Sequence, residues 1–456
     1  MQDPVSRTWI DPTRHAAQRF VRPLQDFIQT EASSGIVMLI AAILAVAWAN
    51  SPWHESYFSL LHTEVFLEIG SFHFEESILD LVNDGLMAIF FFVVGLEIKR
   101  ELAVGELRDP KVAVVPAIAA LGGMIFPAVI YMLFVGFDSP ASHGWGIPMA
   151  TDIAFSLGIA ALLGSRVPLR AKLFLLALAI ADDIGAIAVI AVFYTEELHI
   201  GFMVGSIIAL AVIWLANKLR VRSILFYVVV GVVAWYLMLE SGVHATIAGV
   251  AIGLLTPARP LISSEEFDRR ARRIIETYPA LVRSQADREK IDHEAQMLAT
   301  VANESVSPLN RIEHALVFWS SFVIVPIFAL ANAGVRFEGI SFTEALTSPV
   351  TLGVGAGLFV GKAVGVPLFT WLAVRFRLGE LPAGVTWPHV LGLGALAGIG
   401  FTVALFISGL AFEPGSEFTD LSKIGIFAGS ILSGVVGYTI LRSIPNATST
   451  PIDESV

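Results

Sequence analysis

The stretch Leu173–Phe193 reads LFLLALAIADDIGAIAVIAVF, and it decides the fold class. An apolar run of this length can cross the roughly 30 Å hydrocarbon core of a bilayer as one helix. Two adjacent carboxylates, Asp182 and Asp183, interrupt the run near its midpoint. A carboxylate at that depth costs about 2.5 to 3.5 kcal/mol on insertion scales, and two neighbouring carboxylates also repel each other. We therefore expect a membrane-spanning helix whose acids serve ion chemistry, rather than a soluble core helix.

The composition of the whole chain agrees with a membrane protein. Of its 456 residues 55% are hydrophobic and 15% are charged, whereas soluble domains carry about 25% charged residues. The mean hydropathy is +0.73. A formal net charge of -11 argues against a nucleic-acid partner, and the lack of cysteine excludes disulfides and thiolate metal sites. The polar N-terminus lacks the short apolar core of a cleaved signal, so residues 1–33 are expected to form a cytoplasmic arm.

Hydrophobic runs predict an all-α polytopic fold with twelve transmembrane helices. The predicted spans are 34–50, 79–104, 112–136, 148–163, 169–194, 200–217, 222–239, 244–257, 312–334, 350–375, 388–411 and 421–442. With the N-terminus inside, 26 of the 29 lysines and arginines fall in cytoplasmic segments, which is the positive-inside pattern. We therefore expect a twelve-span domain over 34–442, and a cytoplasmic tail over 443–456.

Two connections between spans carry their own structural signals. Thr63–Glu75 alternates apolar residues on both sides of Gly70-Ser71, which predicts a β-hairpin in an extracytoplasmic segment at 51–78. A lone hairpin is marginal in water, so we expect it to lie on another surface, such as a second subunit; a disordered loop is the alternative. The hydrophilic stretch at 257–310 is expected to be a cytoplasmic loop with one or two amphipathic helices, begun by a capping box at Ser263-x-x-Glu266.

Charged residues inside the predicted spans are the strongest functional signal. Besides the pair Asp182 and Asp183, they are Asp152 in the fourth span and Lys362 in the tenth. Left unpaired, the four would together cost roughly 10 to 14 kcal/mol, so they should face one another or a water-filled cavity. Three acids with one base favour a cation site over a purely structural salt bridge.

The fourth and eleventh spans both carry helix-breaking residues. The fourth contains Pro148 and the polar step Thr151-Asp152, and the eleventh contains four glycines followed by Thr402. Freed half-helix ends at mid-depth can bind ions or substrate. Because these two spans run in opposite directions, spans 3–5 and 10–12 are expected to form an inverted repeat. Close helix packing is the other explanation of the glycines.

The predicted cytoplasmic ends of two spans carry clustered charges. The residues are Glu97, Arg100, Glu101, Glu313 and His314. Such clusters often only anchor helices at the interface. The functional alternative is an entry funnel and pH sensor, because clustered carboxylates and histidine titrate near neutrality. Asp84 and His244, near outer helix ends, and Thr402 in the eleventh span are weaker candidates.

Six motifs together resemble the NhaA-type sodium/proton antiporters over nearly the whole chain. They are ATDIAF at 150–155, AIADD at 179–183, VGLEIKREL at 94–102, SGVHAT at 241–246, FALANAGV at 328–335 and GIGFT at 398–402. The resemblance implies inverted-topology repeats and a homodimer joined by the hairpin. It also implies a bacterial inner-membrane transporter rather than an enzyme. Such a protein needs no cofactor and exchanges sodium or lithium for protons in an electrogenic, pH-regulated way that serves sodium homeostasis.

The same resemblance implies roles for individual residues. Asp183 and Asp182 would carry the ion and the protons, and Thr151 would lie beside them. Asp152 and Lys362 would balance the half-helix ends where the broken spans cross, and Lys362 could also pair with Asp182. The cytoplasmic charge cluster would form the funnel and sense pH.

Two departures from the family pattern lie beside that cluster, and other classes of function are weighed against the antiporter. The family often has a proline before the tryptophan where this chain has Phe318-Trp319, and the 257–310 loop is longer than is common. A sodium-coupled solute symporter would share the broken helices, and solute-dependent sodium flux would distinguish it. An intramembrane aspartyl protease needs its acids on separate helices, and a non-transporting sensor would not need Asp182, Asp183 and Lys362.

Overall fold

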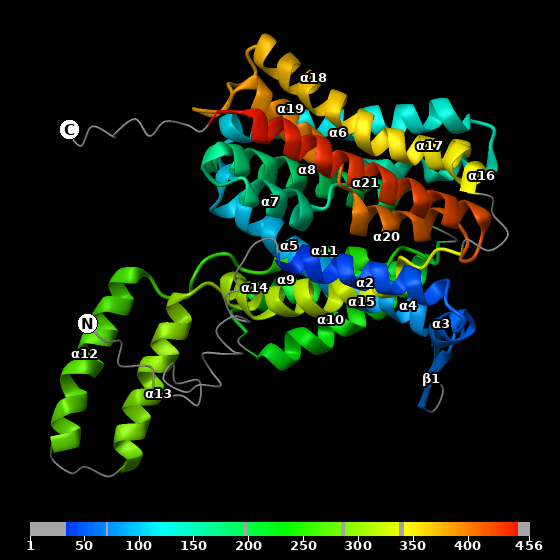
Figure 1. Ribbon diagram of the computed structural model, residues 1–456. Coiled ribbons are helices and arrows are strands. Elements are labelled where there is room, and N and C mark those ends of the chain that lie inside the picture. Colours follow the sequence, from blue (N-terminus) through cyan, green and yellow to red (C-terminus); the bar gives the residue numbers. More distant parts are fainter. Residues whose placement is uncertain are drawn as a thin grey trace, which may run out of the picture. The chain divides into compact units, whose positions relative to one another are not determined.

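The computed structural model describes residues 33–69, 72–195, 198–221, 223–283, 288–336 and 342–445, most of which are helical (Figure 1). The chain divides into two compact units. The first comprises Met1–Leu86, Asp109–Thr195 and Ser321–Val456, and the second comprises Met87–Arg108 and Glu196–Ser320. The predicted N-terminal arm lies outside the described residues except for residue 33, and so does the predicted tail except for residues 443–445.

Eight helices among the described residues are long and apolar enough to cross a membrane. Their bounds are Ile78–Ala103, Pro110–Val135, Pro140–Leu162, Leu169–Phe193, Ile200–Lys218, Pro308–Asn332, Pro349–Arg375 and Glu417–Ser443. The number rises to ten when each of two bent pairs is taken as one span: α2 (Ser33–Ala49) with α3 (His54–Leu61), and α19 (Trp387–Ala397) with α20 (Phe401–Ala411). The shorter apolar helices α10 (Ile224–Leu239) and α11 (Thr246–Leu255) coincide with the two remaining predicted spans. Each of the twelve predicted ranges therefore contains a helix.

The first unit contains the predicted third to fifth and tenth to twelfth spans. Its further elements are α4 (Ile78–Asp80), α6 (Pro110–Val135), η4 (Pro140–Met149), α7 (Ile153–Leu162), η5 (Gly164–Arg166), α8 (Leu169–Phe193), α15 (Val325–Asn332), α16 (Phe342–Thr347), α17 (Pro349–Ala356), α18 (Lys362–Arg375) and α21 (Glu417–Ser443). Within this unit α18 packs along α6, and α21 packs against α17 and α19 (Figure 1).

Glycines let α6 and α18 approach each other closely. A Cβ atom on Gly122 would lie 2.3 Å from the carbonyl oxygen of Gly365, and one on Gly365 would lie 2.2 Å from that of Gly122. A Cβ atom on Gly361 would lie 2.7 Å from the Cα of Pro127. Small residues of this kind drive helix association in membranes, where no hydrophobic effect acts between helices. This contact sets Lys362, the first residue of α18, beside α6.

The two spans predicted to be broken are broken. In the fourth, the 3₁₀ helix η4 ends at Met149, Ala150 and Asp152 have extended backbone, and α7 then begins. In the eleventh, α19 and α20 are bent by 44° across Gly398–Gly400. Both breaks lie in the middle span of a three-span group. The predicted fold class, an all-α polytopic membrane protein with two broken crossing helices, is confirmed.

Three spans predicted as continuous helices contain a π-helical turn. These turns are η2 (Leu81–Leu86), η6 (Ser320–Ile324) and η7 (Gly357–Gly361). A π turn widens the helix and redirects the residues that follow it. The third turn directly precedes Lys362, so it helps to determine where that ammonium group points.

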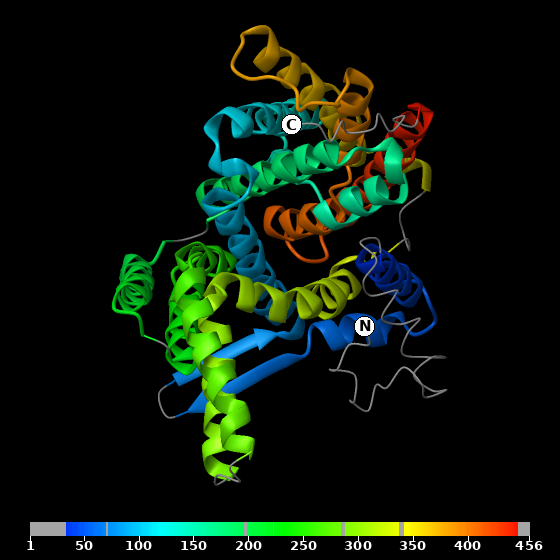
Figure 2. The same ribbon diagram turned by 90° about the vertical axis from the view of Figure 1, so that its left-hand side faces the viewer.

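The predicted hairpin is present in the first unit. Strands β1 (Glu64–Ile69) and β2 (Phe72–Ser77) pair antiparallel, with a register that runs from Glu64–Ser77 to Ile69–Phe72 (Figure 2, blue arrows). Phe66 is 74% exposed on it. The turn residues at 70–71 lie outside the described residues. The alternation of apolar residues thus predicted the hairpin correctly, with its second strand ending two residues later than expected.

The second unit contains the helices of the 257–310 insertion. Its elements are α5 (Met87–Ala103), η3 (Glu106–Arg108), α9 (Ile200–Lys218), α10, α11, α12 (Ser264–Arg283), α13 (Arg288–Ser305) and α14 (Pro308–Trp319). Helices α12 and α13 lie side by side as a pair (Figure 1), so the insertion holds two helices. Ser263 Oγ accepts the Glu266 backbone N–H at 3.2 Å, which is one half of the predicted capping box. A hydrogen bond from Arg270 holds the pKa of Glu266 below its ordinary value.

Candidate functional site

The centre of the first unit contains a buried ion pair between α8 and α18. Lys362 Nζ donates to Asp182 Oδ2 at 2.5 Å, and both side chains are 0% exposed. Thr151, in the break before α7, donates from Oγ1 to the same oxygen at 2.8 Å and accepts from Lys362 Nζ at 3.1 Å. Buried charges of opposite sign are tolerated when they are paired and hydrogen-bonded in this way. The structure therefore brings together three of the predicted site residues.

The Thr151 hydroxyl has two acceptors for a single proton. Besides Asp182 Oδ2, the carbonyl oxygen of Ala397 lies 2.8 Å from Thr151 Oγ1. A hydroxyl group donates one hydrogen bond at a time, so the two acceptors compete for it. Ala397 is the last residue of α19, and this contact therefore joins the ion pair to the broken eleventh span.

Asp183 follows Asp182 on α8. Successive residues of an α-helix are turned by about 100° around its axis, so the two side chains leave the helix in different directions. Lys362 pairs with Asp182, and the side chain of Asp183 is buried with 5% exposure. The two acids thus form one site whose members have different surroundings.

A glycine leaves room beside the second oxygen of Asp182. A Cβ atom on Gly123 of α6 would lie 3.5 Å from Asp182 Oδ1 and 3.4 Å from Lys362 Cδ. Among the residues that the structure describes, Asp182 Oδ1 has no hydrogen-bond partner. A buried carboxylate oxygen without a partner is costly, and a cation or a proton would satisfy it. Sequence reasoning missed Gly123, although the Gly122-Gly123 doublet was a visible sign of close packing.

Asp152 caps two helices where the broken spans cross. It is the N-cap residue of α7, and its Oδ1 accepts the Phe155 backbone N–H at 3.3 Å. Its Oδ2 accepts the backbone N–H of Thr402 at 3.2 Å and the Thr402 hydroxyl at 2.5 Å. The N-cap residue of α20 is Gly400, which has no side chain, so Asp152 supplies the missing acceptor. One carboxylate thus faces the positive ends of two helix dipoles.

Further backbone groups at the crossing are hydrogen-bonded from one broken span to the other. Ser156 Oγ donates to the carbonyl oxygen of Leu396 at 2.9 Å, and the Asp152 N–H donates to that of Ile399 at 2.6 Å. Thr151 and Asp152 are 1% and 3% exposed. Irregular backbone at membrane depth is tolerated only when protein surrounds it or water reaches it. Here the two breaks satisfy each other.

The geometry can be compared with the roles that the family resemblance implies. Asp152 accepts hydrogen bonds at half-helix ends, and Lys362 pairs with Asp182, a pairing that the resemblance also implied. Lys362 is connected to the end of α19 through Thr151. Thr402, predicted as a weaker candidate, is a direct partner of Asp152. Asp84 lies in η2, and His244 lies between α10 and α11.

The predicted pH-sensing cluster assembles in the second unit. An Arg100 guanidinium nitrogen donates to Glu313 Oε1, and Arg100 Nε lies 3.6 Å from Glu101 Oε1. Glu313 is 7% exposed. Glu97 interacts electrostatically with all three of these residues, and His314, which is exposed, interacts with Glu313. Residues from α5 and α14 therefore form one charged cluster, as predicted.

The ion pair and its surroundings offer hard oxygen donors to a small cation. In the described part of the chain, no group of three or more His, Asp or Glu side chains could hold a metal ion. A cation beside Asp182 and Asp183 would therefore combine carboxylate, hydroxyl and carbonyl oxygens, which suit hard cations.

A membrane-spanning helical protein in which two discontinuous helices cross beside buried charges is a secondary transporter by architecture. The family model described as Na+/H+ antiporter 1 matches residues 25–441, and the chain belongs to that family. It is 44% identical over 432 residues to the Na(+)/H(+) antiporter NhaA of Rhodopirellula baltica, covering 94% of this chain and 96% of the relative.

Other relatives are similarly close. The chain is 45% identical over 438 residues to Na(+)/H(+) antiporter NhaA 2 of Sorangium cellulosum, covering 96% of this chain and 93% of the relative. It is 46% identical over 430 residues to the Na(+)/H(+) antiporter NhaA of an Anaeromyxobacter species, covering 94% and 93%. The resemblance that the motifs indicated is confirmed. These relatives are named as transporters, which fits the expectation that the chain is not an enzyme.

Proposed function

We propose that this protein exchanges intracellular sodium or lithium for external protons, with Asp182 and Asp183 as the shared binding groups. The observation that carries the proposal is the fully buried Lys362–Asp182 pair directly beside Asp183. A structural salt bridge would need one carboxylate. A second one next to it in a low-dielectric interior is costly unless a cation or a proton neutralises it.

Competition for Asp182 provides the exchange mechanism. The Lys362 ammonium, a sodium ion and a proton are alternative positive partners of the same carboxylate. A sodium ion held by Asp183 and the open Oδ1 side of Asp182 weakens the hold of Lys362 on Asp182, because the attraction to one carboxylate is then shared. When sodium leaves, Lys362 pairs fully with Asp182 again and a proton neutralises Asp183. The site therefore carries sodium or protons, but not both.

Asp152 has a different role in this proposal. Its two oxygens are engaged by the α7 and α20 ends and by the Thr402 hydroxyl. It keeps the crossing together while the pair on α8 is loaded and unloaded. Alternate exposure of that pair to the two faces of the membrane completes the cycle. If more than one proton moves for each sodium, the membrane voltage contributes about 2.3 kcal/mol per charge per 100 mV.

The remaining assignments extend the same proposal. The twelve-span domain lies in the bacterial cytoplasmic membrane, with both termini and the 257–310 loop in the cytoplasm, because most basic residues then lie inside. The cluster around Arg100 and Glu313 regulates exchange with pH. The hairpin formed by β1 and β2 joins two copies of the chain.

Everted membrane vesicles with an acidic lumen and a fluorescent pH probe test the proposal. Sodium or lithium should alkalinise the lumen of vesicles that contain the wild-type protein, and Asp183→Asn should abolish this response. The matched control is Asp268→Asn, the same change at a carboxylate that pairs with Arg272 on α12. Substantial exchange by Asp183→Asn would refute the assignment of the site, and a response that requires an added solute would indicate symport.

A further inference from the structure

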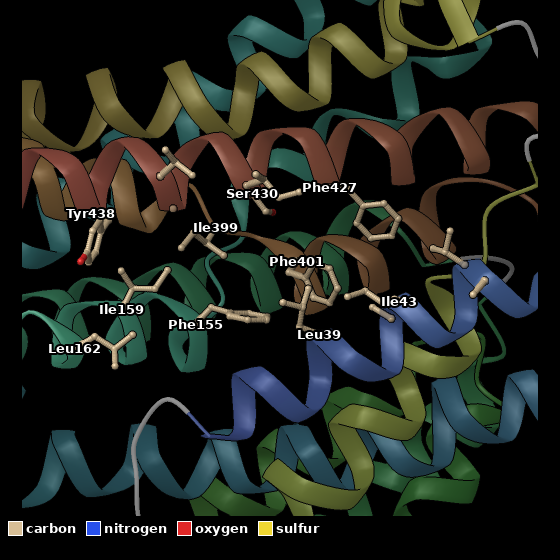
Figure 3. Close-up of a pocket in the computed structure, with 16 residues that line it drawn as sticks. Leu39, Ile43, Phe155, Ile159, Leu162, Ile399, Phe401, Phe427, Ser430 and Tyr438 are labelled. Atoms are coloured by element: carbon tan, nitrogen blue, oxygen red, sulfur yellow. The ribbon is translucent and has the colours of Figure 1, made fainter. Parts of the chain in front are cut away.

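The first unit contains an elongated apolar pocket beside the crossing of the two broken spans. It has a volume of about 720 Å³ and is bounded by α2, α7, the α19–α20 break and α21. Its side chains include Ile43 of α2, Ile159 of α7, Ile399 in the break, and Phe427 and Tyr438 of α21; Figure 3 shows them around one continuous space. The volume falls within the roughly 300 to 1,000 Å³ typical of ligand sites.

The pocket is open to the surroundings of the protein. Residues along its rim are strongly exposed although they are apolar: Ile43 59%, Leu162 67% and Ile431 64%. Its walls belong to segments whose length and apolar composition suit membrane spans, and the chain belongs to a family of membrane antiporters, so the medium outside is the hydrocarbon of lipids. Water gains little there, because among the described lining residues only Ser430 and Tyr438 have polar side chains.

The dimensions of the pocket fit one leaflet of a bilayer. Phe427 and Tyr438 mark its two ends along α21, and eleven residues of helix correspond to about 16 Å. This is about half of the roughly 30 Å hydrocarbon thickness. The Tyr438 end lies near the end of the helix at Ser443, where tyrosine is typical of the membrane interface. The Phe427 end then lies near the midplane.

A cation marks the interfacial end. The guanidinium of Arg442 lies 5.8 Å from the centroid of the Tyr438 ring, and Arg442 is exposed. Arginine binds phosphate oxygens through two parallel hydrogen bonds. At the other end, the Phe401 ring packs against Phe427 with centroids 5.6 Å apart and leaves the pocket apolar. The pocket, apolar along its length and cationic at the Arg442 end, is thus complementary to an amphiphile with an anionic head group.

We propose that this pocket binds one acyl chain of a membrane phospholipid, whose phosphate lies against Arg442. The acyl chain contacts Phe155, Ile399 and Phe401, which flank the two helix breaks, so the lipid packs directly against the crossing. Residues 1–32 are a less suitable occupant, because their sequence carries charged side chains at short intervals. A second copy of this chain would bring no phosphate to Arg442.

Photolabelling tests the proposal on the intact protein. Purified protein is reconstituted in vesicles of phosphatidylethanolamine and phosphatidylglycerol that contain phosphatidylglycerol with a photoreactive group in the middle of an acyl chain. After illumination, mass spectrometry maps the labelled peptides. Label should concentrate on the pocket-lining parts of α2, α7 and α21, above the level on other lipid-facing helices such as α9.

Two variants should occlude the pocket. Gly434→Leu fills its wall between Ile159 and Ile399, where a Cβ atom makes ordinary contacts at 3.5 Å, and Ile431→Trp covers its exposed rim. Each should lower pocket labelling by about tenfold, equivalent to about 1.4 kcal/mol of lost lipid affinity. Arg442→Gln should lower it by a smaller factor. The matched control is Leu432→Trp, the same new side chain at an exposed neighbour outside the pocket, which should leave labelling unchanged.

Several results would overturn the proposal. One is uniform labelling of all lipid-facing helices, and another is equal labelling of the Ile431→Trp and Leu432→Trp variants. A third is a photoreactive side chain at position 431 that cross-links to residues 1–32 or to a second copy of the chain instead of to lipid. Elution of each variant as a single species of wild-type size shows that it is folded. The readout is lipid attachment, so the result does not depend on whether the protein exchanges sodium for protons.

Discussion

Asp152 and Thr402 connect two helices that are each interrupted at the same place. The Asp152 carboxylate caps α7, the helix that begins at the next residue. It also accepts hydrogen bonds from the backbone N–H and the hydroxyl of Thr402, at the start of α20. A helix N-terminus carries a partial positive charge, and two of them would repel each other without a shared anion. The carboxylate is therefore a structural requirement of the crossing.

Thr402→Val should destabilise the protein moderately. It removes the hydroxyl donor to Asp152 but keeps the backbone donor, so we expect a loss of about 1 to 2 kcal/mol in the free energy of unfolding. Thermal unfolding in detergent, followed by intrinsic fluorescence, measures the change. Thr402→Ser retains the donor and is the control. Equal stability of Thr402→Val and wild type would show that the hydroxyl contact at 2.5 Å contributes nothing.

Lys362 and Asp182 should show strong coupling in a double-mutant cycle. Lys362→Met leaves a buried carboxylate without its cation, which costs about 3 to 5 kcal/mol, whereas Lys362→Met combined with Asp182→Asn removes both charges. The double variant should therefore be more stable than Lys362→Met alone, although it should not exchange ions. Unfolding temperatures of the wild type and the three variants give the coupling energy. Additive losses would contradict a direct pair.

Gly123→Ala should weaken sodium binding. The new Cβ atom would lie 3.5 Å from Asp182 Oδ1 and would occupy the open side of that carboxylate. It would also lie 3.0 Å from Cγ2 of Val366, so that side chain must shift by a few tenths of an ångström, and thermal unfolding of the variant is measured alongside. We expect the sodium concentration for half-maximal exchange to rise by about tenfold, equivalent to about 1.4 kcal/mol. The control is Gly201→Ala on α9, where a Cβ atom meets nothing within 4 Å. An unchanged sodium dependence would place the cation elsewhere.

Arg100→Gln should disturb the charged cluster of the second unit. Glu313 would lose the cation to which it is hydrogen-bonded, and a buried acceptor left without its charged partner costs about 1 to 3 kcal/mol. The pH profile of sodium-dependent exchange should change together with stability. Arg270→Gln is the control, because it removes a guanidinium of the same kind from an exposed pair with Glu266. If both variants keep the wild-type profile, the cluster is only an interfacial anchor.

The family resemblance implied that Lys362 could pair with Asp182, but the residues by themselves did not choose among the acids. The intramembrane charges were visible one by one, since each interrupts a hydrophobic run. The acid that pairs with Lys362 did not follow from those runs, because the partners are 180 residues apart and the choice depends on how α8 is rotated. The partnership of Asp152 with Thr402, 250 residues apart, was hidden for the same reason. Gly123 carries no charge, and its importance follows only from its position beside Asp182 Oδ1.

The amino-acid sequence by itself determined that the chain spans a membrane, where its helices lie, where two of them break, and where a hairpin forms. These features follow from properties of neighbouring residues: hydrophobic length, glycine and proline content, and period-two alternation. The tertiary structure alone decided that Lys362 neutralises Asp182, that one carboxylate caps both broken helices, and that an apolar pocket lies against their crossing. Hydrogen bonds and ion pairs depend on distances of a few ångströms between distant segments, and only the packing of the helices sets those distances.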